Sequence, residues 1–107
     1  MAKSRAYTDL YNDLPKKSGR ICINAKPDES GELLICGDPE GLRYLAAVLT
    51  WLAGFDQAKN PDPVGSREHL HFRPGAQLDV PSCPVEVCRA DAKGTGELPN
   101  FMRQEKD

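Results

Sequence analysis

Residues 37–54 decide the fold, and their sequence is G-D-P-E-G-L-R-Y-L-A-A-V-L-T-W-L-A-G. Asp38 has the short carboxylate typical of a helix N-cap, and Pro39 suits the first helical position because its fixed φ is already helical. Gly54 is a typical C-terminal stop. The pattern therefore predicts a helix over residues 38–53.

This predicted helix is apolar on two sides. At 100° per residue, one arc of about 120° holds six apolar side chains, which we expect to cover the sheet. They are Leu42, Leu45, Ala46, Leu49, Leu52 and Ala53. A second arc on nearly the opposite side follows the spacing i, i+3, i+4, i+7 and consists of Tyr44, Ala47, Val48 and Trp51. Because a helix with two apolar sides is usually covered on both, the second arc needs a cover of its own.

Three covers for the second arc remain open. The chain itself offers Tyr7, Leu10, Tyr11 and Leu14, which repeat the same spacing and predict a short N-terminal helix before Pro15. A homodimer or a partner protein is the second, because Trp and Tyr are enriched in binding hot spots and exposed apolar patches mark interfaces. Partial exposure to solvent is the third. The candidate partner-binding residues are therefore Tyr44, Ala47, Val48 and Trp51.

Outward from the helix, four segments have the period-two pattern of strands. They are residues 20–25, 32–36, 67–72 and 84–89, and the turn residues between the first two make that pair an antiparallel hairpin. The order ββ-α-ββ predicts an α+β fold. We expect a mainly antiparallel four-stranded sheet with the long helix packed on one face, together with the short N-terminal helix.

Apolar residues are concentrated in the middle of the chain. We expect residues 20–90 to form a single α+β domain, preceded by an N-terminal segment, residues 1–19, that holds the short helix. Residues 91–107 mix charges, glycine and proline with few apolar side chains, which predicts a disordered tail.

Composition and charge exclude several functional classes. The 107 residues carry a formal net charge of −2 with both signs mixed, which argues against nucleic-acid binding. No apolar run approaches the ~18 residues of a membrane span, so we expect no membrane binding. The first 20 residues show no apolar signal-peptide region, which favours a cytoplasmic location. In that reducing compartment the four cysteines are expected to be free thiols.

Two histidines raise the question of metal binding or catalysis. His69-x-His71 on a strand places two imidazoles on one side of the sheet, and zinc takes such ligands. The cysteines, however, lack the C-x-x-C spacing of zinc sites, and the chain has no phosphate-binding loop or nucleophile motif. We therefore expect no metal and no cofactor. The alternative is a small hydrolase or metal-dependent enzyme that uses His69, His71 and a cysteine.

Two segments resemble a known family. They are G-D-P-E-G-L-R-Y-L-A-A-V-L (residues 37–49) and E-H-L-H-F-R-P-G-A-Q-L-D-V-P-S (residues 68–82), the latter followed by V-E-V. In this order they resemble small bacterial immunity proteins of polymorphic toxin systems, the immunity protein 32 type, over residues 37–89. The resemblance implies an α+β fold and a non-enzymatic protein-binding module whose partner is a toxin that it neutralises. It implies no catalytic residues.

Overall fold

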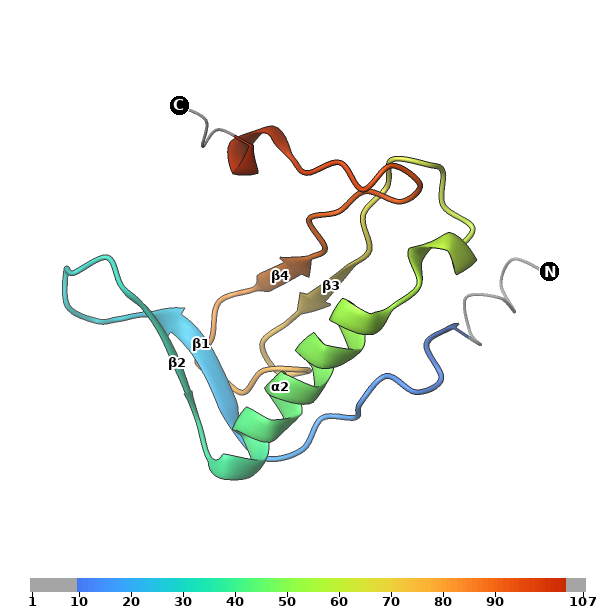
Figure 1. Cartoon of the computed structure of the whole chain (residues 1–107). Coiled ribbons are helices and arrows are strands. Elements are labelled where there is room, and N and C mark those ends of the chain that lie inside the picture. The colour runs from blue at the N-terminus through green and yellow to red at the C-terminus, as the bar shows by residue number, and fades with distance from the viewer. Residues whose placement is uncertain (1–9, 104–107) are drawn as a thin grey trace.

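The computed structural model describes residues 10–103 and confirms an α+β chain with four strands and one long helix (Figure 1). The elements are β1 (Ile21–Ala25), β2 (Leu33–Gly37), α2 (Pro39–Gly54), β3 (His69–Phe72) and β4 (Val85–Cys88), with short 3-10 turns η1 (Gln57–Lys59) and η2 (Asn100–Met102). Helix α2 begins as expected, because the Asp38 side chain accepts a hydrogen bond from the Gly41 N–H at 2.7 Å. None of the helices within residues 10–103 has the length and hydropathy that a membrane span requires.

The expected four-stranded sheet is wrong: the strands form two separate antiparallel pairs, β1 with β2 and β3 with β4. The reason is that an irregular segment, residues 79–83, occupies the second edge of β1. The Asp79 N–H donates to the Ile21 carbonyl at 2.8 Å, and the Cys83 N–H donates to the Ile23 carbonyl at 2.9 Å. With this edge filled, β1 has no edge left for β3 or β4.

Two side chains complete this strand-like contact with β1. The Ile21 N–H donates to the Asp79 carboxylate at 2.8 Å, and the Ile23 N–H donates to the Ser82 hydroxyl at 3.0 Å. Lys17 also pairs with Asp79, at 3.1 Å. Side-chain acceptors thus replace the carbonyl groups that a regular neighbouring strand would present, which satisfies the β1 amides without a strand.

The short N-terminal helix expected before Pro15 is not seen in residues 10–14; Tyr7, the first residue of its predicted stripe, lies outside the described residues. Its described part is not helical beyond Leu10, since the chain turns over residues 11–13. The expected contact is nevertheless made there. Tyr11 lies with its ring centroid 5.5 Å from that of Trp51, and Leu14 packs against the core.

The core shows that α2 is rotated relative to the expected packing. Its buried centre consists of Ile21, Ile23, Tyr44, Val48, Phe72 and Leu78. Tyr44 and Val48, expected on the far side of the helix, therefore face the sheets, whereas Leu42 and Leu49 are 45% and 41% exposed. The helix packs along the boundary between its two apolar arcs, so each arc is half covered.

Close packing at Gly41 explains this rotation. A side chain at Gly41 would overlap the main chain of Arg20, so only glycine allows α2 to approach β1 at this point. Asp38 holds the two segments together: its N–H donates to the Arg20 carbonyl at 3.1 Å, and its carboxylate accepts from the Arg20 N–H at 3.0 Å. Because Gly41 faces β1, Tyr44 and Val48, which lie one and two turns later on the same side of the helix, face the core.

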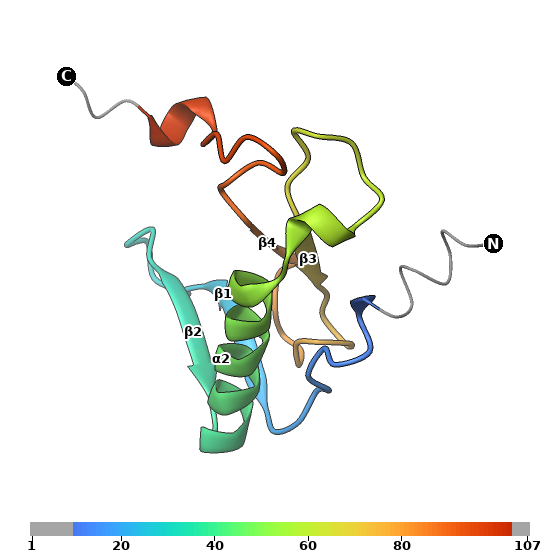
Figure 2. The same ribbon diagram turned by 45° about the vertical axis from the view of Figure 1, so that its right-hand side comes forward.

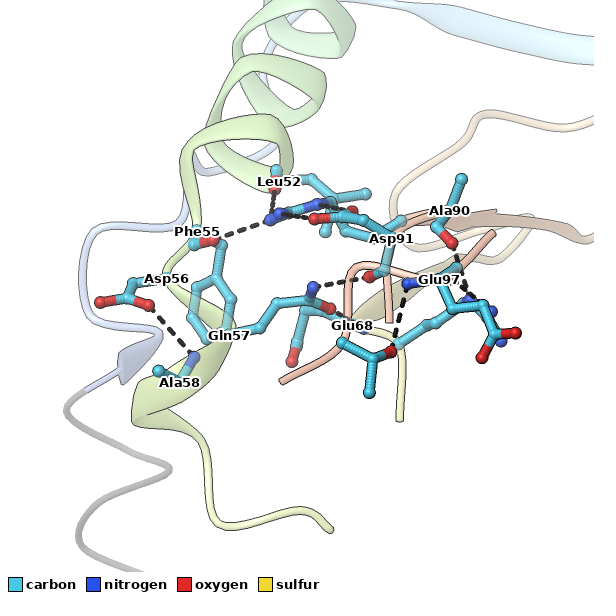
Figure 3. A network of polar contacts seen from close by, with 12 residues as sticks. Leu52, Phe55, Asp56, Gln57, Ala58, Glu68, Ala90, Asp91 and Glu97 are labelled. Atoms are coloured by element: carbon cyan, nitrogen blue, oxygen red, sulfur yellow. Dashed lines mark hydrogen bonds and ion pairs between the residues drawn. The ribbon is translucent and has the colours of Figure 1, made fainter. Parts of the chain in front are cut away.

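A polar network joins the C-terminal end of α2 to the chain that follows β4 (Figure 3). Arg89 donates to the carbonyls of Leu52 and Phe55 at 3.0 and 2.7 Å and forms an ion pair with Asp91 at 2.7 Å. The buried Gln57 side chain accepts from the Glu68 N–H and donates to the Asp91 carbonyl. These contacts extend beyond residue 90, the expected end of the domain, while disorder of the tail stays a prediction.

Candidate interaction surface

Exposed apolar side chains gather on β2 and on the outer side of α2. We call the set on the helix side of the sheet the β2–α2 surface; its members are Leu33, Ile35, Leu42 and Leu49, while the exposed Leu34 lies on the opposite face. Leu33 is 60% exposed and Ile35 is 50% exposed, although the alternating pattern of a strand places both on one face. Figure 2 shows β2 at the margin of the molecule, with β1 and α2 on its inner side.

The hydrogen-bonding pattern shows which main-chain groups of β2 point outward. In an antiparallel pair, residues alternate between exchanging hydrogen bonds with the partner strand and pointing away from it. Ile21 and Ile23 use their main-chain groups on residues 79–83, so they make no ladder bonds with the residues opposite, Gly37 and Ile35. The N–H and C=O groups of Leu33, Ile35 and Gly37 therefore point away from β1.

This outer edge of β2 pairs with no strand among residues 10–103. Ile35 is opposite the core residue Ile23, so the side chains of Leu33 and Ile35 lie on the helix side of the sheet. Leu34 and Cys36 lie on the other side, where they line a hollow of about 310 Å³ together with Cys22 and Pro81. Both faces of the strand are thus apolar and accessible.

The surroundings of β2 are acidic. Residues 26–43 contain five carboxylates and two cations, namely Asp28, Glu29, Glu32, Asp38, Glu40, Lys26 and Arg43. Hydrogen bonds from Arg20 and Gly41 N–H groups keep the pKa of Asp38 below its ordinary value, and hydrogen bonds from Ser30 do the same for Asp28. Lys26 forms an ion pair with Glu32 at 2.9 Å, which leaves an excess of negative charge at the N-terminal end of the strand, where Asp28 and Glu29 lie, whereas the positive charges of Arg20 and Lys17 act on Asp38 at the other end.

Comparison with known proteins identifies the family. The family model for immunity protein 32 matches residues 32–90, which is more than half of the chain. The chain belongs to the immunity protein 32 family. The match begins at β2 and ends just after β4, so it contains every residue of the β2–α2 surface. No curated protein and no solved structure matches the chain.

In this member of the immunity protein 32 family, the residues expected to bind a partner are divided. Tyr44 and Val48 are buried in the core, where burial raises the pKa of the Tyr44 hydroxyl. Ala47 is exposed, and Trp51 is half-buried. The earlier picture of one continuous binding arc is therefore corrected for Tyr44 and Val48, while a binding role for Ala47 and Trp51 stays a prediction.

Trp51 belongs to an aromatic cluster at the end of α2. Its ring centroid lies 5.1 Å from that of Phe55, and its indole N–H donates to the Asp13 carboxylate at 3.1 Å. Tyr11 stacks on Phe55 with 5.9 Å between ring centroids, so the three rings contact one another mutually. An open groove of about 650 Å³ adjoins the cluster and is lined in part by Thr50 and Lys59.

The two histidines lie on one exposed face of β3, as expected, with ring centroids 5.1 Å apart. His69 is opposite Cys88, and His71 is opposite Glu86. Among residues 10–103 no group of three or more histidine, cysteine, aspartate or glutamate side chains is placed to hold a metal ion. Burial, with a smaller contribution from Glu86, raises the pKa of the Cys88 thiol, the opposite of what a nucleophilic cysteine needs.

Proposed function

We propose that this chain is a non-enzymatic immunity protein that neutralises a protein toxin by binding to it. The observation that carries the proposal is the match of the immunity protein 32 family over residues 32–90. Neutralisation of this kind requires a surface that covers a functional part of the toxin, and it requires no reacting group on the immunity protein.

The β2–α2 surface supports binding on physical grounds. Fully burying a leucine or isoleucine side chain contributes roughly 1.5–3 kcal/mol. Ile35, Leu42 and Leu49 are about half exposed, so each has about 1 kcal/mol left to gain when a partner covers it. The carboxylates around the strand would attract a basic partner over a distance and speed its association.

Ala47 and Trp51 form a second contact area in this proposal. They lie on the flank of α2 opposite Leu42 and Leu49, next to the groove at the aromatic cluster. Trp is among the residues most enriched in binding hot spots. A toxin large enough to reach around α2 would contact both areas, and a homodimer through the Trp51 side is the alternative use of this area.

The test is co-expression of the chain with the protein encoded by the adjoining gene. We expect that protein alone to arrest growth, and the chain to restore growth and to co-purify with it in a stoichiometric complex. Leu49→Lys should weaken rescue, whereas Val64→Lys, which alters another exposed aliphatic side chain in the loop before β3, should not. Failure of the wild-type chain to restore growth or to form a complex would overturn the proposed function.

Trp51→Ala tests the second contact area in the same assay. Loss of complex formation by a variant with an unchanged far-ultraviolet circular dichroism spectrum would support a contact at Trp51. Retention of full affinity would restrict the toxin to the β2–α2 surface.

A further inference from the structure

The outer edge of β2 lacks the features that keep an edge strand from pairing. Natural edge strands are protected by lysine, proline, bulges or a covering segment. The strand sequence L-L-I-C-G contains neither charge nor proline, and its register with β1 is regular over all five residues. Leu33, Ile35 and Gly37 thus present outward main-chain groups with no described segment over them. Such an edge can accept one more strand.

Both faces of the sheet at this edge can receive the side chains of an added strand. Successive side chains of a strand point to opposite faces. One set would lie on the helix side, with Leu33 and Ile35, and the other would enter the hollow lined by Leu34, Cys36 and Pro81. In strand addition, main-chain hydrogen bonds supply affinity and such alternate pockets supply specificity.

Charge disfavours a second copy of this chain as the added strand. Antiparallel self-pairing centred on Ile35 is the register in which all five β2 residues are paired. It would place Glu32 opposite Asp38 of the other copy, and by symmetry this like-charge contact would occur twice. Because the loop before β2 carries Asp28, Glu29 and Glu32 against the single cation Lys26, the complementary strand carries a basic residue at the end that lies beside this loop.

We propose that the occupant of this edge is an extended segment of the toxin that adds to β2 as a third strand. Its side chains alternate as apolar groups on both faces of the sheet, and a lysine or arginine residue flanks it near Asp28 and Glu29. This inference rests on the proposed function, because it names the site and the recognition mode for the same partner.

The variant Ile35→Pro tests main-chain pairing. Proline removes the Ile35 N–H, which points outward, so the β1–β2 ladder keeps its hydrogen bonds, and proline is tolerated on such edges. We expect Ile35→Pro to lower affinity for an inactivated form of the toxin by about 30-fold or more, the size of a hot-spot loss. Ile35→Val, which keeps the N–H and a branched side chain, should change affinity less than about 5-fold, and Val64→Lys should leave it unchanged.

Amide hydrogen exchange of the wild-type chain gives a second readout that does not depend on the folding of a variant. Binding of the inactivated toxin should slow exchange at Leu33, Ile35 and Gly37 by at least about 10-fold, since these N–H groups become hydrogen-bonded. Glu29→Gln, at an acidic residue beside the strand, should lower the association rate and make it less sensitive to salt.

The outcomes separate the two proposals. No complex with the wild-type chain would overturn the proposed function and this inference with it. A complex in which the three amides stay unprotected and Ile35→Pro binds normally would overturn strand addition alone. A wild-type dimer that Ile35→Pro converts to monomer would assign the edge to a second copy and would also overturn the inference.

Discussion

Replacing Gly41 with alanine should destabilise the protein, although alanine is the better helix former. Alanine in place of glycine gains at most about 1 kcal/mol in a helix. The added methyl group, however, would overlap the carbonyl oxygen and carbonyl carbon of Arg20. Overpacking costs roughly 1–3 kcal/mol when neighbours can shift, and here the obstacle is main chain held by Asp38. We take the upper end of that cost and expect a net loss of about 2 kcal/mol.

Thermal and urea unfolding followed by circular dichroism measure this loss. A loss of about 2 kcal/mol corresponds to a decrease in Tm of roughly 8–16 °C for a domain of this size. Gly54→Ala is the matched control. It makes the same chemical change at the last residue of the same helix, where a methyl group would have no atom within 4 Å. We expect that control to be neutral or slightly stabilising, by less than about 1 kcal/mol.

Equal stability of Gly41→Ala and wild type would refute the reasoning. It would mean that α2 can move away from β1 at no cost, and that the close approach at Gly41 does not set the rotation of the helix. The exposure of Leu42 and Leu49, which depends on that rotation, would then need another explanation.

Three further predictions concern the polar network, acid stability and the thiols. Arg89→Met should lower the free energy of unfolding by about 2–3 kcal/mol in urea titrations, because the carbonyls of Leu52 and Phe55 lose their donor. Arg103→Met, at an exposed arginine, should lower the free energy of unfolding by less than about 0.5 kcal/mol. Hydrogen bonds from Ile21 N–H and from Lys17 hold the pKa of Asp79 below its ordinary value. The stabilising contribution of the Asp79 carboxylate is therefore present above about pH 4 and is lost as the pH falls through the native pKa. Asp79→Asn should be less stable than wild type at pH 7 and should lose less stability than wild type between pH 5 and pH 2. Thiol titration of the unfolded, unreduced protein should find four free thiols. In the native protein, Cys36 should react before Cys88, because burial raises the pKa of the Cys88 thiol. A slower reaction at Cys36 would contradict that order.

Local patterns in the sequence were sufficient for the elements and for the family. The Asp38 cap, Pro39 and the apolar run that follows depend only on neighbouring residues, and the structure confirms helix α2 within a residue of its expected ends. The strands were predicted equally well because period-two patterns are local too. The same segments carried the resemblance to immunity protein 32, which the family match over residues 32–90 confirms.

The arrangement of those elements was decided by the tertiary structure. Apolar alternation along a strand predicts a covered face, yet Leu33 and Ile35 remain exposed, because whether a strand is covered depends on what packs beside it. Nothing in the pattern of residues 73–84 showed that Asp79 and Ser82 would close the second edge of β1 and divide the sheet. Likewise, both arcs of α2 are apolar, so periodicity alone could not choose between them; a single close contact between Gly41 and Arg20 did.

The sequence by itself therefore determined the helix, the strands and the family, because short-range sterics and capping act within a few residues. Only the tertiary structure decided which apolar side chains remain at the surface, because that depends on contacts between segments about 20 to 60 residues apart, and it placed the exposed edge of β2 and the outer side of α2 where a partner can reach them.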